Sequence, residues 1–288
     1  MRPSILEYLQ RHGWGLLANL VPTPGMVYTI LLLVLAYGMV RRSRELQLDL
    51  PRLTTDRALE SVLAAAVGAG IGTRLFYLLT SGAILRLDFI TWFSPSTGTA
   101  SWGAYLGGVL GLIAYARWRS LPPLRLLDAA TSIAPLSEVI GRWSCFLAGD
   151  DFGRISNVPW AIRYPTESLA WKAHVARGEI ERSALTSLPV HPVQFYLMVN
   201  AVVVLIIVTL VWRRWRRVPG VTTGAWLMAH GLTRFWWEFF RDPAAGGAES
   251  GLSVSQWTCI GFAGAGLAIL LVQRRARLQQ NQTSASAV

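Results

Sequence analysis

Seven apolar stretches constrain this chain more than any other feature of its sequence. A bilayer core about 30 Å thick is crossed by about 20 helical residues, and its interior has no water to bind backbone N–H and C=O groups. Continuous apolar runs of this length therefore indicate membrane helices. The expected spans are residues 24–40, 59–80, 99–116, 124–148, 190–212, 222–240 and 254–273. With 52% hydrophobic and 15% charged residues, we expect an all-α polytopic membrane protein with seven transmembrane helices.

Basic residues collect in alternate connections between these spans. The connections after spans one, three, five and seven hold 15 arginines, whereas the opposite side has nine basic residues, five of them in one long loop. The 15 are Arg41, Arg42, Arg44, Arg52, Arg57, Arg117, Arg119, Arg125, Arg213, Arg214, Arg216, Arg217, Arg274, Arg275 and Arg277. The positive-inside rule then predicts an outside N-terminus and a cytoplasmic C-terminus. Topology accounts for the net charge of +11, and we expect no nucleic-acid partner.

The same spans define the expected domains. Residues 1–273 form a single seven-helix membrane domain, in which residues 149–189 make a small extracytoplasmic head between spans four and five. Residues 274–288, which include the low-complexity stretch QQNQTSASAV, are expected to be a disordered cytoplasmic tail. No sustained apolar core precedes the first span, so we expect no cleavable signal peptide.

Several ionisable residues fall inside the expected spans. They are Arg74, Asp128, Glu138, Arg142, Arg234 and Glu238. Such a residue costs about 2.5–3.5 kcal/mol at the bilayer centre and usually faces a protein interior or a wet cavity. Glu138 and Arg142, and likewise Arg234 and Glu238, are four residues apart, so each pair shares a helix face. One interpretation is a set of structural ion pairs; the other is an anionic ligand, because the arginine fork suits a phosphate.

Two further features point to the outer surface and to close packing. In VHPVQFYLMVN, Pro192 suits the first turn of a helix and leaves His191 at the cap, while Gln194 and Tyr196 carry polar groups into an apolar helix. A single interfacial histidine is more often structural than catalytic. The glycines of spans two and three allow close approach of backbones or of a lipid chain, and ordinary helix packing explains any one of them.

Taken together and in order, five motifs resemble those of the bacterial prolipoprotein diacylglyceryl transferase family. They are IGTRLFYLL in span two, GRWSCFLAGDDFGR with Asp128 and Pro135 before it, NVPWAIRYP, VHPVQFY and GLTRFWWEFFRDP. The resemblance runs from about residue 22 to residue 273, and the expected seven-span topology agrees with it.

This resemblance implies transfer of the diacylglyceryl group from phosphatidylglycerol to the lipobox cysteine of a lipoprotein precursor, with a thioether formed and glycerol phosphate released. The protein would be a multi-pass protein of the bacterial cell (inner) membrane. Arg142 and Arg234 match the family's essential arginines, and Glu238 would orient Arg234. The expected substrate-binding residues are Tyr28, Arg74, Asp128, Gly149, Gly153, Arg154, His191, Gln194 and Tyr196. No cofactor is expected, and the scattered histidines give no metal-ligand spacing.

The chain departs from the family pattern at three positions. Gly103, in SWGAYLGG, falls where the family's proposed basic histidine would be; Cys145 replaces an asparagine, and Leu197 replaces a glutamate. His230, four residues before Arg234 on the same helix face, is an alternative catalytic base, unless the thiol needs none at a wet surface. Buried Cys145 is more often packing than nucleophile. Two other functions remain open: a related transferase with another acceptor, and a silent lipid-binding membrane protein.

Overall fold

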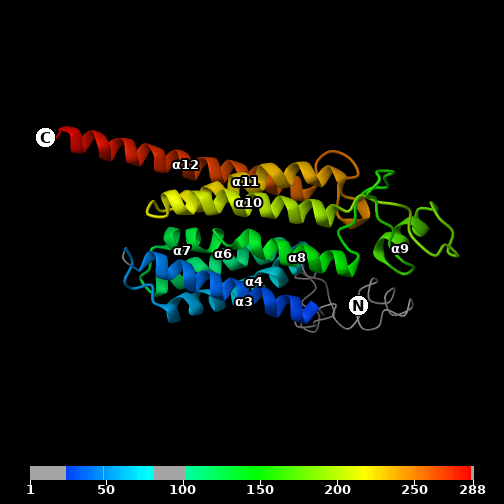
Figure 1. Cartoon of the computed structure of the whole chain (residues 1–288), viewed down its shortest axis with the longest axis horizontal. Coiled ribbons are helices and arrows are strands. Elements are labelled where there is room, and N and C mark those ends of the chain that lie inside the picture. Colours follow the sequence, from blue (N-terminus) through cyan, green and yellow to red (C-terminus); the bar gives the residue numbers. More distant parts are fainter. Residues whose placement is uncertain (1–23, 48, 81–100, 287–288) are drawn as a thin grey trace.

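The protein is described by a computed structural model that covers residues 24–47, 49–80 and 101–286. The helices, in chain order, are α3 (Pro24–Leu46), α4 (Thr55–Thr80), α6 (Ser101–Trp118), α7 (Pro123–Thr131), α8 (Ala134–Ala148), α9 (Leu169–Ala176), α10 (Val193–Trp215), α11 (Val221–Trp237) and α12 (Val254–Ser286), with the 3-10 turns η2 (Glu238–Phe240) and η3 (Pro243–Ala245). The long helices lie side by side along one axis, α9 and its loops form one end of the molecule, and α12 extends beyond the other end (Figure 1).

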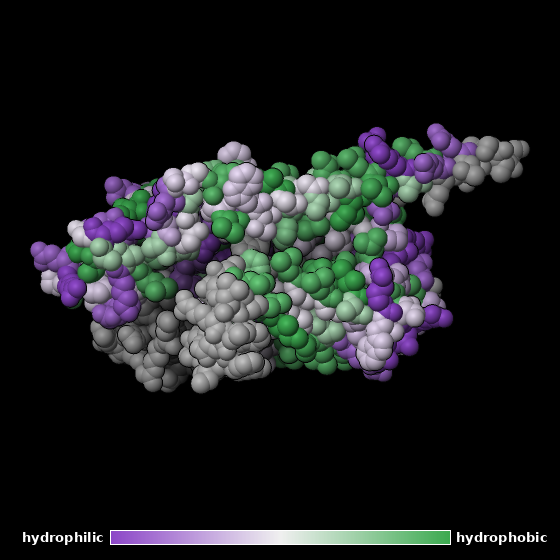
Figure 2. Space-filling model, turned by 180° about the vertical axis from the view of Figure 1, so that it is seen from behind, coloured by the Kyte–Doolittle hydropathy of each residue, from purple (hydrophilic) through white to green (hydrophobic). Residues whose placement is uncertain are grey.

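Helices occupy all seven of the predicted ranges, so the prediction of an all-helical membrane protein is confirmed for the described residues. Three stretches are long and apolar enough to cross a membrane by length and composition, namely Thr55–Leu79, Val193–Trp215 and Val254–Ala276. Figure 2 shows hydrophobic residues gathered along the middle of the helices and hydrophilic residues at the two ends. Many large apolar side chains on these helices are exposed, which suits contact with lipid rather than water.

The fourth predicted span is two helices rather than one. The sequence predicts a single span over residues 124–148, but α7 ends at Thr131 and α8 begins at Ala134. Pro135 lies in the first turn of α8, has no N–H to donate to Thr131, and would clash with that carbonyl in a continuous helix. The proline therefore separates a short helix at the end opposite the head from the helix that leads to the head.

The C-terminal tail also differs from the prediction. Residues 274–288 were expected to be disordered, but α12 remains helical through Ser286. The stretch RRARLQQ contains good helix formers and neither glycine nor proline. The helix therefore continues beyond the end of the apolar run.

The head is built from loops around α9 and a small apolar core. Four buried side chains form this core, namely Phe152, Tyr164, Ala170 and Val190. Strand-like pairing in the described residues is limited to isolated bridges, among them Ile162 with Val190. Ser168 begins α9, where its hydroxyl accepts a hydrogen bond from the backbone N–H of Trp171 at 3.2 Å.

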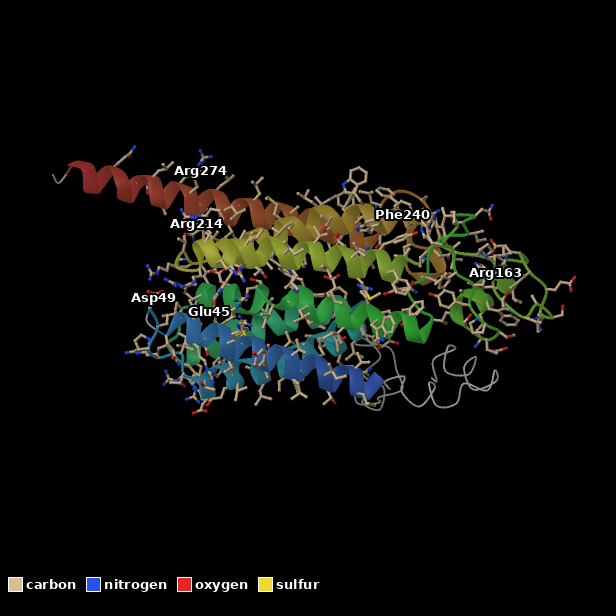
Figure 3. The ribbon with its side chains drawn as sticks, viewed as in Figure 1. Glu45, Asp49, Arg163, Arg214, Phe240 and Arg274 are labelled. Carbon is tan, nitrogen blue, oxygen red and sulfur yellow. The ribbon has the colours of Figure 1, made fainter. Side chains whose placement is uncertain are left out.

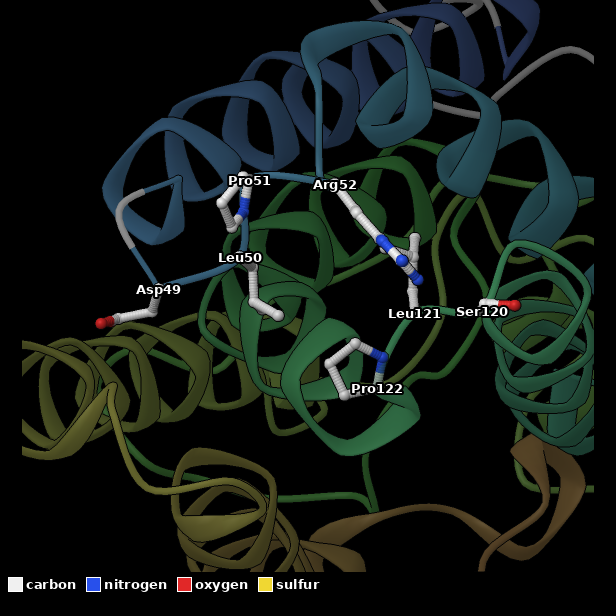
Figure 4. Close-up of a pocket in the computed structure, with 7 residues that line it drawn as sticks. All are labelled: Asp49, Leu50, Pro51, Arg52, Ser120, Leu121 and Pro122. Atoms are coloured by element: carbon white, nitrogen blue, oxygen red, sulfur yellow. The ribbon is translucent and has the colours of Figure 1, made fainter.

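Charged residues and a pocket lie at the end opposite the head. Figure 3 shows Glu45, Asp49, Arg214 and Arg274 there, whereas Phe240 and Arg163 lie at the head end. The pocket has a volume of about 270 Å³ between the loop after α3 and the link from α6 to α7 (Figure 4). Its lining contains none of the residues that the sequence analysis assigns to the active site.

Helices α4 and α6 pack backbone against backbone through glycines. A Cβ atom added at Gly107 would overlap the carbonyl oxygen of Gly68 and lie 2.8 Å from the Cα of Gly72. A Cβ at Gly103 would overlap the carbonyl oxygen of Gly72 and lie 2.6 Å from the Cβ of Phe76. Small residues are needed wherever two membrane helices approach this closely. No side chain fits at position 103 without separating the two helices.

We expect Gly107→Ala to destabilise the protein, because its new methyl group meets backbone atoms that cannot move aside. The free energy of unfolding should fall by about 1–3 kcal/mol, the usual cost of overpacking. Gly70→Ala is the matched control, since nothing lies within 4 Å of a Cβ at that position. Thermal unfolding of the purified variants in detergent measures both effects. Equal midpoints for the two variants would contradict this account of the α4–α6 contact.

Candidate active site

Five charged side chains near the head end form one ion-paired group, which we call the arginine network. Nη1 of Arg142 lies 2.5 Å from Oδ2 of Asp151, and Arg241 pairs with Oδ1 of the same carboxylate. Arg241 also lies 3.4 Å from Oε1 of Glu238, whose Oε2 lies 2.5 Å from Nη1 of Arg234. The network is therefore continuous from α8 to α11.

Burial within the arginine network is graded. Arg234 and Glu238 are only 4% and 1% exposed, whereas the side chains of Arg142, Asp151 and Arg241 are 18%, 18% and 15% exposed. Buried charges require partners, and here each guanidinium faces a carboxylate. The network thus begins inside the protein and ends at side chains that are partly exposed.

Backbone pairing near the head aligns the two halves of the network. The N–H of Arg154 donates to the carbonyl of Phe240 at 2.8 Å, and that of Asp242 donates to Phe152 at 3.1 Å. Gly153 and Arg241 form the antiparallel bridge between these two bonds. The segment that carries Asp151 is therefore fixed beside the segment that carries Arg241.

Two glycines of the predicted signature make this turn feasible. Gly149 ends α8 with a φ of 69°, a left-handed conformation that a residue without Cβ adopts at little cost. A Cβ at Gly153 would overlap the carbonyl oxygen of His191 and lie 2.6 Å from its Cβ. Both predicted glycines therefore lie beside the network and shape the backbone around it.

The start of α10 packs against the same turn. Gln194 is fully buried, and its Nε2 donates to the carbonyl of Asp150 at 2.5 Å and to the hydroxyl of Tyr164 at 2.8 Å. Tyr196 accepts a hydrogen bond from Nε1 of Trp160 at 2.6 Å, and its hydroxyl lies 3.1 Å from Nδ1 of His191. These three predicted residues thus join α10 to the head and to the loop before Asp151.

One predicted ion pair is correct and the other is wrong. Arg234 and Glu238 pair as their spacing predicts. Glu138 and Arg142 do not pair with each other, because Arg142 pairs with Asp151 and Oε2 of Glu138 lies 3.3 Å from Nδ1 of His230. Glu138 and Arg142 therefore each pair with a residue of another segment rather than with each other.

Four other predicted residues lie apart from the network or outside the description. Asp128 on α7 accepts hydrogen bonds from the backbone N–H groups of Gly220 and Thr223 at 2.6 and 2.8 Å, so it caps α11 at the end opposite the head. The guanidinium of Arg74 on α4 lies 5.7 Å from the ring centre of Tyr77. Arg154 is exposed and donates to the carbonyl of Ala248 at 2.7 Å. The side chain of Tyr28 lies outside the described residues.

The two carboxylates that follow α8 differ in their electrostatics. Burial alone would raise the pKa of Asp151, but the guanidinium groups of Arg241 and Arg142 outweigh it and hold the pKa below its usual range. Burial raises the pKa of Asp150 to about 6, and the charge of Asp151 adds to this increase. Asp151 is consequently a permanent anion of the network, whereas Asp150 gains a proton under mildly acidic conditions.

Among the described residues, one group has its possible metal ligands within 4.8 Å of one another. It consists of Cys145, Asp150 and Asp151. Two guanidinium groups already pair with Asp151, and their positive charge opposes a cation at the same carboxylate. Cys145 is partly buried and is a free cysteine. The arrangement favours an anion beside the arginines over a metal ion beside the acids.

Asp151 and Arg241 were not among the site residues predicted from the sequence. Both lie in the quoted motifs, but a search for charges inside membrane spans passes over them, since each lies just beyond the end of an expected span. The useful signal was the motif itself. An arginine three residues after Glu238 lies on the same side of a helical turn as that carboxylate, and η2 continues the helix far enough to bring the two together.

Comparison with known proteins gives consistent matches. The family model for prolipoprotein diacylglyceryl transferase matches residues 21–272. The phosphatidylglycerol–prolipoprotein diacylglyceryl transferase of Rhizobium meliloti is 30% identical over 207 residues, or 70% of this chain and 66% of that protein. Those of Ralstonia pickettii and Burkholderia ambifaria are each 30% identical, over 247 and 239 residues. These matches cover 80% and 77% of this chain and 81% and 79% of the two relatives.

The family match includes every element that carries the arginine network, from α8 through the turn after α11. The predicted resemblance is thereby confirmed. This chain belongs to the prolipoprotein diacylglyceryl transferase family.

Proposed function

We propose that this membrane protein is a transferase that moves the diacylglyceryl group of phosphatidylglycerol onto the lipobox cysteine thiol of a lipoprotein precursor. The names of the relatives supply the donor and the class of acceptor. The observation that carries the proposal is the arginine network, in which three guanidinium groups face two carboxylates at the head end of the helices. An excess of positive charge at an accessible edge suits a phosphodiester.

The reaction requires a group that takes up negative charge as it leaves. The thiol sulfur attacks the glycerol carbon that bears the phosphate, the S–C bond forms, and the C–O bond to phosphate breaks. Glycerol phosphate then departs with one more negative charge than the phosphodiester carried. Arg142 and Arg234 would contact that phosphate and stabilise the developing charge, while Asp151 and Glu238 hold the guanidinium groups in place.

The remaining residues would shape the two substrate paths. Five residues surround the turn before the network and would border the acceptor peptide. They are Gly149, Gly153, His191, Gln194 and Tyr196. Three more would contact the lipid or its approach, namely Tyr28, Arg74 and Arg154. The exposed apolar sides of the helices suit acyl chains that remain in the bilayer.

The proposed setting is a bacterial inner membrane crossed seven times, with the N-terminus and the head outside. The broken helix α7–α8 would count as one crossing, because its two parts together have the length of a span. The arginine-rich end opposite the head, with Arg214 and Arg274, would face the cytoplasm. The network would then lie near the outer surface, where a secreted precursor arrives.

The first experiment is a transfer assay with the purified protein, phosphatidylglycerol and a lipobox peptide. We expect release of glycerol phosphate and a peptide whose mass increases by one diacylglyceryl group. A peptide with serine in place of the lipobox cysteine is the control and should remain unmodified. A protein that is folded and binds phosphatidylglycerol but leaves the cysteine peptide unmodified would contradict the proposed activity.

Arg142→Lys should lower kcat/KM for transfer by about 10²-fold, as expected for removal of one preorganised donor to a developing anion. Lysine keeps the charge but cannot pair with Asp151 and with a phosphate through a planar fork. Arg163→Lys is the matched control, because Arg163 is an exposed arginine of the head that donates a hydrogen bond to the carbonyl of Ser187. A fully active Arg142→Lys variant would show that the phosphate is held elsewhere.

Asp151→Asn tests whether the network is a positioning device. The amide keeps the shape but loses the charge that holds Arg142 and Arg241 together, so we expect transfer to slow by about 10²-fold. Asp49→Asn is the control, since Asp49 lies 3.9 and 3.7 Å from Arg125 and Arg217 at the other end of the bundle. Steady-state kinetics at several donor concentrations check the expectation, and similar rates for both variants would refute it.

A further inference from the structure

The pair Glu138 and His230 lies one helical turn from the arginine network. Glu138 precedes Arg142 by four residues on α8, and His230 precedes Arg234 by four residues on α11. Nδ1 of His230 lies 3.3 Å from Oε2 of Glu138, which is within ion-pair distance, and the two side chains are only 4% and 6% exposed. The pair therefore joins the same two helices as the network does, at a position deeper inside the protein.

The surroundings of the pair fix the imidazole ring. Trp226 stacks on His230 with ring centres 5.4 Å apart and an angle of 24° between the rings, and Phe262 lies 6.3 Å away. In a neutral imidazole that carries its proton on Nδ1, the other ring nitrogen, Nε2, is the proton acceptor. A carboxylate on one nitrogen and a free lone pair on the other is the arrangement that a general base requires.

Other buried carboxylates in the bundle are bound more completely. Asp128 accepts one hydrogen bond from Gly220, just before α11, and two from Thr223 of α11, and Glu238 contacts Arg234, Arg241 and Ser253. Among the described residues, Oε1 of Glu138 is buried and finds no hydrogen-bond partner. Leaving such an oxygen unsatisfied destabilises the folded protein, so packing alone gives no reason for a glutamate at this position.

The proposed reaction needs a proton acceptor, and position 103 cannot supply one. The close contact between α4 and α6 excludes any side chain at Gly103, where the resemblance would place a histidine. Cysteine thiols ionise near pH 8.5, so only a small fraction is thiolate at neutral pH. The guanidinium groups of the network donate protons in hydrogen bonds but do not accept them, and its two carboxylates are already paired with those guanidinium groups.

We infer that His230 is the general base for the acceptor thiol and that Glu138 is its positioning residue; this inference rests on the proposed transferase function. Nε2 takes the thiol proton as the sulfur attacks the glycerol carbon, and Glu138 stabilises the imidazolium that forms. The S–C bond forms, the C–O bond breaks, and the leaving phosphate departs as a dianion beside Arg142 and Arg234. The imidazolium then returns its proton to that phosphate or to water, which restores the neutral ring.

Other ionisable groups surround the pair and enter any pH dependence. Arg142 on α8 and Arg234 on α11 interact electrostatically with Glu138. Tyr105 on α6 and Cys259 on α12 do so as well. The two arginines remain charged at all accessible pH values, and the tyrosine and the cysteine are neutral near pH 7. A change of rate with pH can therefore be assigned by comparing variants of His230 and Glu138.

The test compares the rates of wild type, His230→Gln and Glu138→Gln from pH 6 to pH 9. At pH 7 we expect His230→Gln to lose about 10²–10⁴-fold in kcat/KM, the usual contribution of a positioned general base, and Glu138→Gln to lose less. The deficit should shrink as the pH approaches that of thiol ionisation, about 8.5. His174→Gln, in which a buried histidine of the head is removed, is the matched control and should give no pH-dependent deficit.

A selenocysteine peptide separates a base from a merely structural pair. A selenol is already ionised at neutral pH, so both variants should modify this peptide at nearly the wild-type rate. A deficit that is equal at every pH and with both peptides would overturn the inference, as would a fully active His230→Gln variant. If His230→Gln does not fold, Glu138→Gln with the two peptides decides the question. Wild-type transfer is measured first, because its absence would contradict the proposed function rather than this inference.

Discussion

The architecture of the site depends on one electrostatic requirement: guanidinium groups removed from water must face carboxylates. Breaking such a buried pair by removing one partner typically costs about 3–5 kcal/mol, because a charge is left unpaired in a medium that solvates it poorly. Arg142 meets this requirement with Asp151, and Arg234 meets it with Glu238. Arg241 contacts both carboxylates and so joins two local ion pairs into one. Helices α8 and α11 are thereby coupled through charge at their head ends.

The head supports the same coupling from outside the helices. Arg177, which follows α9, donates two hydrogen bonds to the carboxylate of Asp242, at 2.9 and 3.2 Å. Asp242 also accepts from the N–H of Ala244 and begins η3. Because Asp242 is the next residue after Arg241, this contact fixes the end of the network to the head.

The sequence predicted the helices well and the charge partners only in part. Apolar runs identify membrane helices because the bilayer imposes both length and composition, and the pair Arg234–Glu238 follows from helix periodicity alone. Helix periodicity does not predict the partner of Glu138, because His230 is on another helix and sequence spacing carries no information about contacts between helices. Asp151 and Arg241 meet only because backbone pairing brings together two segments about 90 residues apart. The break at Pro135, by contrast, could have been predicted from the missing N–H.

Charge counting relates this arrangement to the chemistry of group transfer. Three guanidinium groups and two carboxylates leave the network with one positive charge, which matches a phosphodiester with its single negative charge. In the proposed reaction, the phosphate gains a second negative charge as the C–O bond breaks, so its attraction to the network would increase from ground state to transition state. Only an interaction that strengthens in this way accelerates the chemical step. Asp150, whose pKa is raised to about 6, reduces the positive excess when it ionises, so the field around the leaving phosphate weakens as the pH rises above that value.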